Sequence, residues 1–250
     1  MVFIDVHSHL DICRDVDKII QNARKLNVKV ILACGVNSKT NREVLKLSKK
    51  YPEVKACLGI YPIDALKISN EKINSEIEFI RKNKSKIVAI SEIGLDLKQA
   101  PEKTFLKQKK NLLKFIELSQ KLDVPLIVHS RKAEQQTIEL LESSNYKKII
   151  MHCFSGKLKL VKRIIDNDWF LSIPTCVKHS EHFQKIIELA PITRFFCETD
   201  SPFLHPDKLQ NNEPANVIES YKAIARIKGL KLTQVEKQIE KNYMELFAEV

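Results

Sequence analysis

Short apolar runs alternate along this chain with longer segments in which apolar residues recur at helical spacing. Runs of this kind are typical of buried strands, and the spacing between them predicts amphipathic helices. We expect strands at Met1–Leu10, Val28–Cys34, Val54–Ile60, Ile87–Glu92, Pro125–Val128, Lys148–His152, Trp169–Ile173 and Phe195–Thr199. We expect helices near Asn37–Lys50, Glu71–Lys82, Glu102–Leu122, Lys157–Asn167, Glu181–Leu189 and Ala215–Phe247, the last broken near Gly229.

Strands that alternate with helices in this way build a parallel sheet whose outer face the helices cover. The chain has 250 residues and no Pro/Gly-rich linker or low-complexity tract. Its length matches the usual size of a barrel of eight strands and eight helices. We therefore predict one α/β domain, a single (β/α)8 TIM barrel over residues 1–250.

Polar residues follow the apolar runs at the places where this architecture puts its chemistry, which are the C-terminal ends of the strands. A buried polar group there costs about 1 to 3 kcal/mol unless something satisfies it. One such residue could be incidental, but six on one rim are difficult to explain by packing. The six are His7, His9, Glu92, His129, His152 and Asp200.

The opening stretch, M-V-F-I-D-V-H-S-H-L, carries the densest part of this pattern. Alternate residues of a strand share a face, so Asp5, His7 and His9 point the same way. A lone histidine is more often a packed or surface residue than a ligand. Two imidazoles at a spacing of two, directly after an apolar strand, instead favour a divalent metal site.

Four histidines and two carboxylates are too many for one tetrahedral ion, and they suit two ions about 3.5 to 4 Å apart that share a carboxylate. Glu92 is our candidate bridge, because its strand lies midway round the barrel. His7, His9 and Asp200 would then hold one ion, and His129 and His152 the other. Asp200 is also our candidate to orient or deprotonate the attacking water, which makes Asp200 and Glu92 the predicted catalytic carboxylates.

Several motifs resemble those of a known family. They are D-V-H-S-H-L, S-E-I-G-L-D, I-V-H-S-R, H-C-F-S-G, E-T-D-S-P and N-E-P, in this order over nearly the whole chain. In order and spacing they resemble the TatD family of metal-dependent deoxyribonucleases. The resemblance implies a barrel of the metal-dependent hydrolase type, with the six residues above as ligands of Mg, Mn or Zn. It also implies exonuclease or endonuclease hydrolysis of phosphodiesters in single-stranded or damaged DNA.

Some rim positions depart from the family pattern. The family usually has G-x-H-P after the third strand, and here Tyr61 replaces the histidine; Leu97, Lys132 and residues 208–211 also differ. We expect the substrate contacts to differ accordingly. Arg131 and Lys157 are candidates to hold phosphates, and Phe154, Tyr61 and Phe203 to stack on bases.

Composition bears on partners and location. The net charge of +11 suits a polyanion such as DNA, although lysines that solvate helix faces would give the same value. The six cysteines form no C-x-x-C pair, which indicates reduced thiols. Without a signal peptide or a long apolar run, we expect a cytoplasmic monomer with no membrane partner.

Two other functions fit parts of the pattern. A different hydrolase on the same barrel would use the same ions to cut an amide or ester, such as an aminoacyl-tRNA bond. A non-catalytic nucleic-acid-binding module would be expected to have lost some of the ligands, and the sequence keeps all six.

Overall fold

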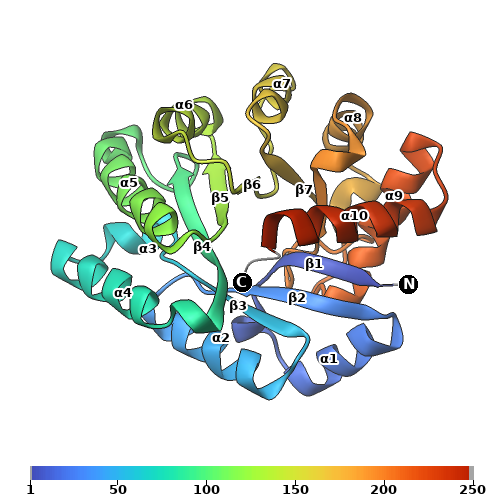
Figure 1. The fold of residues 1–250 in the computed structure, drawn as a ribbon, viewed down its shortest axis with the longest axis horizontal. Coiled ribbons are helices and arrows are strands. Elements are labelled where there is room, and N and C mark those ends of the chain that lie inside the picture. Colours follow the sequence, from blue (N-terminus) through green and yellow to red (C-terminus); the bar gives the residue numbers. More distant parts are fainter. Residues whose placement is uncertain (1, 248–250) are drawn as a thin grey trace.

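The computed structural model describes residues 2–247, which form an eight-stranded parallel sheet surrounded by helices (Figure 1). The strands follow one another round the sheet in chain order, so each pairs with its sequence neighbour. The predicted barrel class is confirmed. The strands are β1 Phe3–Ser8, β2 Val28–Cys34, β3 Val54–Leu58, β4 Ile87–Asp96, β5 Leu126–Arg131, β6 Ile149–Met151, β7 Phe170–Pro174 and β8 Phe195–Glu198.

The two ends of the sheet meet beside β1, where the residues that follow β8 complete the barrel. The main-chain N–H of Asp200 donates to the carbonyl of His7 at 2.9 Å, and that of His9 donates to the carbonyl of Ser201 at 2.7 Å. These bonds join the first strand to the end of the last. Residues nearly 200 positions apart in sequence therefore lie side by side at one rim.

The helices lie outside the sheet, where their apolar faces pack against the strands (Figure 1). They are α1 Val16–Lys25, α2 Ser38–Lys50, α3 Pro62–Leu66, α4 Asn70–Lys82, α5 Phe105–Leu122, α6 Glu134–Ser144, α7 Lys159–Asp166, α8 Glu181–Leu189, α9 Ile218–Lys228 and α10 Leu232–Phe247. The predicted break in the last helical segment is confirmed: Gly229, with φ of 66°, ends α9.

The local sequence explains where α2, the helix that follows β2, begins. The Asn37 side chain accepts from the main-chain N–H groups of Lys39 and Thr40, and the Thr40 hydroxyl accepts from the N–H of Asn37. This reciprocal cap satisfies N–H groups that a helix start leaves unpaired. It fixes the start of α2 at Ser38, so that only three residues separate the helix from the end of β2.

Most predicted strand boundaries differ from the observed ones by one to four residues, and the largest difference, at the fourth strand, bears on the site. The fourth strand was expected to end at Glu92, but β4 continues to Asp96 and its last residues still pair with β5. The register between the two strands shifts between Ile90 and Ile93. Such an irregularity changes the direction of a side chain within a strand. Glu92 is therefore held inside a strand at this irregularity.

The six cysteines are free thiols, in line with the absence of a C-x-x-C pair. Within residues 2–247, no helix is both long enough and apolar enough to cross a membrane.

Candidate metal centre

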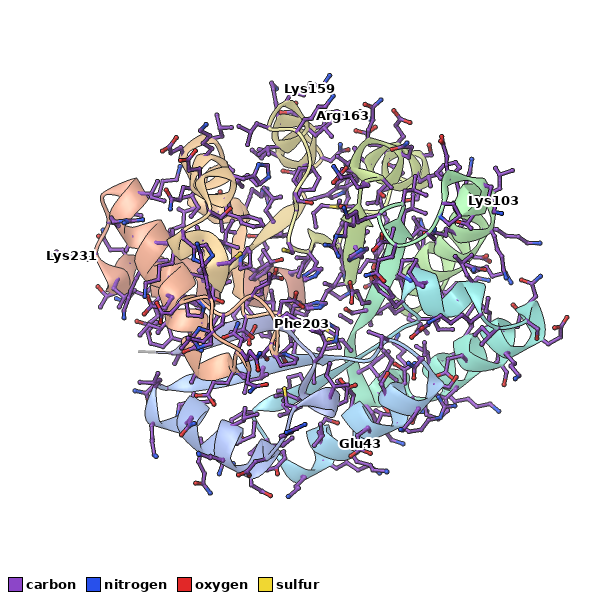
Figure 2. All side chains as sticks on the ribbon, turned by 180° about the vertical axis from the view of Figure 1, so that it is seen from behind. Glu43, Lys103, Lys159, Arg163, Phe203 and Lys231 are labelled. Carbon is purple, nitrogen blue, oxygen red and sulfur yellow. The ribbon has the colours of Figure 1, made fainter. Side chains whose placement is uncertain are left out.

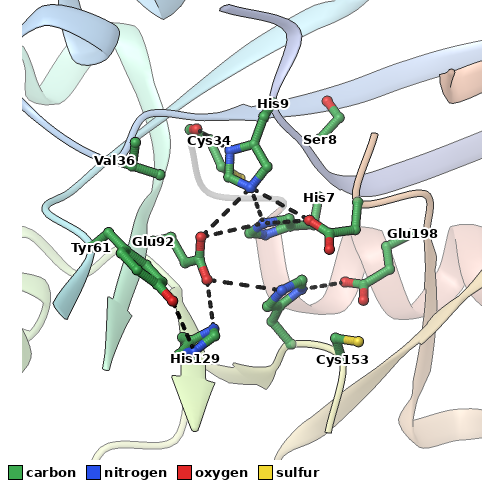
Figure 3. A network of polar contacts seen from close by, with 12 residues as sticks. His7, Ser8, His9, Cys34, Val36, Tyr61, Glu92, His129, Cys153 and Glu198 are labelled. Atoms are coloured by element: carbon green, nitrogen blue, oxygen red, sulfur yellow. Dashed lines mark hydrogen bonds and ion pairs between the residues drawn. The ribbon is translucent and has the colours of Figure 1, made fainter. Parts of the chain in front are cut away.

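The six residues predicted from the strand ends converge at the mouth of the barrel (Figure 3). His7 and His9 come from the end of β1, Glu92 from β4 and His129 from β5. His152 follows β6 directly, and Asp200 follows β8. Their convergence depends on the barrel, which brings the C-terminal ends of all eight strands to one side.

One group of ligand atoms lies on the β1 side. Nε2 of His7 and Nε2 of His9 are 3.2 Å apart, and Oδ1 of Asp200 lies 3.7 and 3.4 Å from them. Ligands about 2.1 Å from a tetrahedral ion are separated by about 3.4 Å. These three side chains are thus spaced to share one ion, and they form one of the two candidate metal groups in the described chain.

Glu92 lies between this group and the other two histidines. Its Oε2 is 3.9 Å from Nε2 of His7 and 3.6 Å from Nε2 of His9. Its Oε1 is 2.7 Å from Nδ1 of His129 and 3.9 Å from Nε2 of His152. The two oxygens of one carboxylate therefore face different pairs of imidazoles, as a bridging ligand requires.

Three of the imidazoles have their other nitrogen fixed by an oxygen outside the centre. Nδ1 of His9 lies 3.1 Å from the carbonyl oxygen of Cys34. Nε2 of His129 lies 3.1 Å from Oδ2 of Asp96, and Nδ1 of His152 lies 2.8 Å from Oε2 of Glu198. Such acceptors hold a metal-binding histidine in the right tautomer and orientation. The residues present therefore fit divalent ions.

Asp96 and Glu198 were not predicted as part of the site. Each belongs to a motif that carries the family resemblance, E-I-G-L-D and E-T-D-S-P. Both are fully buried carboxylates, which is rare without a charged or hydrogen-bonding partner. An acidic residue at an apolar strand end was the available signal, but the sequence does not say which histidine it faces.

The fourth imidazole, His7, is arranged differently. Its Nδ1 is buried and has no hydrogen-bond partner within residues 2–247. Its ring stacks on that of His152, with 3.7 Å between ring centroids. His7 also belongs to the second candidate metal group, with Glu92 and His152. It thus lies between the two sides of the centre.

The close carboxylates and imidazoles shift one another's protonation. Burial alone raises the pKa of Glu92, but the imidazoles of His129, His152 and His7 outweigh it and hold the pKa far below its usual value. Burial alone likewise raises the pKa of Asp96, yet its bonds with His129 and Tyr61 lower it to about 2. Both groups are therefore carboxylates at neutral pH.

Two of the histidines, His9 and His152, have pKa values that shift in the opposite direction from those of Glu92 and Asp96. Burial lowers the pKa of His9, but Asp200 and Glu92 outweigh it and raise the pKa to about 9. Burial also lowers the pKa of His152, but Glu198 together with Asp200 and Glu92 raises it to about 10. Without metal, these rings hold protons at neutral pH, so a bound cation competes with protons.

Asp5 shares the face of the two β1 histidines, as predicted, but supports the centre indirectly. Its carboxylate accepts from the N–H of Thr199 at 2.9 Å and from the hydroxyl of Thr199 at 2.6 Å. Because Thr199 precedes Asp200, these bonds tie the last strand end to the first. Asp200 has a φ of 53°, an uncommon backbone conformation that this anchoring helps to hold.

A cavity of about 620 Å³ opens over the centre. Among the predicted substrate contacts, Arg131, Tyr61 and Phe203 line it together with five of the six predicted ligands. Figure 2 shows Phe203 near the middle of that view, and its side chain is 53% exposed. Its ring therefore lies open to solvent beside His9, at 6.2 Å between ring centroids.

The other two predicted contacts lie elsewhere. Phe154 is only 1% exposed and packs in the hydrophobic core, so no face of its ring is open to a base. This corrects the stacking role expected of it. The reason is the turn after His152, which directs the Phe154 ring under Gly156. Lys157 is exposed on the following loop and is not among the residues that line the cavity.

An eight-stranded barrel with clustered histidines and carboxylates at its mouth defines a metal-dependent hydrolase of the TIM-barrel class. A family model described as TatD related DNase matches residues 4–248. The chain belongs to the TatD family of metal-dependent hydrolases.

Individual relatives agree with this assignment. The human protein named deoxyribonuclease TATDN3 is 32% identical, over 98% of this chain and 94% of its own length. A protein of Methanocaldococcus jannaschii named as an uncharacterized metal-dependent hydrolase is also 32% identical, over 98% of this chain and 96% of its own. The crystal structure of the TatD homologue YJJV from Escherichia coli has a TM-score of 0.92 at 23% identity, covering 98% of each chain. That structure shows the same fold.

Proposed function

We propose that the protein is a deoxyribonuclease that hydrolyses phosphodiester bonds with two divalent ions, Mg, Mn or Zn. The observation that carries this proposal is the position of Glu92, whose two oxygens face two separate sets of ligands. His7, His9 and Asp200 would hold one ion, and His129 and His152 the other. All six ligands come from one chain, so the centre needs no second copy.

Two bound ions would supply a water that ionises near neutral pH and positive charge on the phosphate oxygens. The protein's own groups do the rest. Asp200 orients the water and accepts its proton, since its carboxylate is at the open side of the centre with 16% of its side chain exposed. Arg131, exposed on the cavity wall, offers a guanidinium to the substrate phosphates.

The shape of the cavity favours single-stranded DNA. A volume of about 620 Å³ accommodates part of a single nucleotide strand and is too small for a duplex. The exposed ring of Phe203 at its rim gives an unpaired base a surface on which to stack. The human relative is named a deoxyribonuclease, which supports the choice of DNA.

Cleavage of labelled oligonucleotides by the purified protein tests the proposal. We expect Mg²⁺ or Mn²⁺ to support cleavage of single strands and an excess of chelator to abolish it. Asp200→Asn should lose turnover, whereas Asp168→Asn, a change at an exposed carboxylate paired with Arg194, should not. An aminoacyl ester assayed in parallel tests the alternative function, which is hydrolysis of an ester or amide by the same ions. Cleavage of the ester but not of DNA would contradict the proposal.

A further inference from the structure

The hydroxyl of Tyr61 points toward the metal centre. It donates a hydrogen bond to Oδ2 of Asp96 at 2.6 Å. It also lies 3.5 Å from Nε2 of His129, a contact drawn in Figure 3. The phenol ring meets the His129 ring edge to face, with 5.0 Å between centroids. The hydroxyl group is thus part of the surroundings of one proposed ligand.

Asp96 is fully occupied as an acceptor. Its Oδ1 accepts from the main-chain N–H groups of Lys98 and Gln99 at 2.8 and 2.7 Å. Its Oδ2 accepts from Tyr61 and faces Nε2 of His129 at 3.1 Å. A carboxylate surrounded by donors has no proton to offer, so Nε2 of His129 must carry the hydrogen of their shared bond.

Gln99 fixes the direction of the phenol proton. Its Nε2 donates to the hydroxyl oxygen of Tyr61 at 3.2 Å. The hydroxyl therefore accepts from Gln99 and donates to Oδ2 of Asp96, the same oxygen that accepts from His129. The bonds converge on this carboxylate and hold in place the oxygen that orients the His129 ring.

The consequence appears on the other side of the His129 ring. With the hydrogen of Nε2 held by Asp96, Nδ1 is the atom at which a cation can displace a proton, and it donates that proton to Oε1 of Glu92 at 2.7 Å in the metal-free protein. Turning the ring by half a rotation would lose both contacts. The orientation of this ligand thus depends on what holds Asp96 in place.

We propose that Tyr61 is a positioning residue that acts through Asp96 to present Nδ1 of His129 to the second ion, which is the one held by His129 and His152. This inference rests on the proposed two-metal function. It concerns this chain in particular, because the family pattern usually has a histidine at this position. A histidine could also donate to Asp96, but a phenol does so without competing for the metal.

Titration of the metal-free protein with Mn²⁺, followed by calorimetry and electron paramagnetic resonance, tests the inference without relying on activity. We expect the wild-type protein to bind two ions and to show the signal of a coupled pair at saturation. Tyr61→Phe keeps the ring and removes the hydroxyl. It should weaken the second binding event by about 10-fold, the low end for an outer partner of a ligand, and leave the first unchanged.

The matched control is Tyr51→Phe, which also keeps a buried ring and removes its hydroxyl. That hydroxyl donates to Asp17 at 2.7 Å, far from the centre. It should leave both events unchanged. Tyr61→His restores a donor and should recover part of the second affinity. Melting temperatures of all variants show that each is folded.

The outcomes separate the two proposals. Two wild-type binding events that Tyr61→Phe leaves unchanged, or weakens equally, would overturn the role of Tyr61 alone. A single event in the wild-type protein would overturn both that role and the two-metal function.

Discussion

The two sides of Glu92 hold their histidines by different means. On the β1 side, His7 lies in the strand and His9 directly follows it, and the outward nitrogen of His9 faces the main-chain carbonyl of Cys34. On the other side, His129 and His152 come from separate strands. Their outward nitrogens face side-chain carboxylates, which are Asp96 and Glu198.

This difference indicates on which side of Glu92 a single substitution can change the ion affinity. A main-chain acceptor survives any side-chain change, so the β1 side depends only on the fold and on its own ligands. A carboxylate acceptor is removed by a single substitution. The second side is therefore the one whose ion affinity a single supporting substitution should change while the fold stays the same.

The largest expected effect comes from the residue common to both sides. Glu92→Gln should lower turnover by about 1,000-fold or more, equivalent to about 4 kcal/mol, because both sets of ligands lose their shared anion. Cleavage rates under saturating Mn²⁺ measure this. A variant that melts close to the wild-type temperature would have lost chemistry alone. A much lower melting temperature would instead show that Glu92 serves the stability of the fold.

A smaller effect should separate the two sides. Glu198→Gln removes the charge behind His152, and we expect the affinity for the second ion to fall by about 10 to 100-fold, with the first ion unaffected. Calorimetric titration with Mn²⁺ resolves the two events. Glu142→Gln is the control, since Glu142 pairs with Arg163 on the outer helices. Equal weakening of both ions would contradict the proposed independence of the sides.

The prediction that distinguishes the two sides least is a pH dependence that both sides share. In the metal-free protein, the pKa of His9 is raised to about 9 and that of His152 to about 10. Both rings are protonated at pH 7, so metal binding must release protons and apparent affinity should rise from pH 7 to 9. The slope is about tenfold per pH unit for each proton displaced. Calorimetry in buffers of different ionisation enthalpy counts these protons, and a pH-independent affinity would contradict the shifts.

The same contrast explains what the sequence could predict. The two histidines at the end of β1 are visible because strand alternation places His7 and His9 on one face, and the other four predicted ligands follow from the rule for strand ends. The barrel itself follows from the repeated spacing of apolar runs. These are local patterns, and the structure brings their members together.

The supporting residues depend on contacts that no local pattern contains. Asp96 and Glu198 acquire their roles from histidines 33 and 46 residues away. The burial of Phe154 follows from a turn rather than from its spacing. The inward direction of Glu92 follows from a register shift between β4 and β5. Pairings of this kind require the folded barrel.

The central claim is that Glu92 joins two metal ions, and a crystal structure with Mn²⁺ tests it most directly. The anomalous scattering of Mn identifies each ion independently of the protein atoms. We expect two peaks about 3.5 to 4 Å apart, one on each side of the Glu92 carboxylate. A single peak at saturating Mn²⁺, or two peaks that do not share Glu92, would contradict the claim.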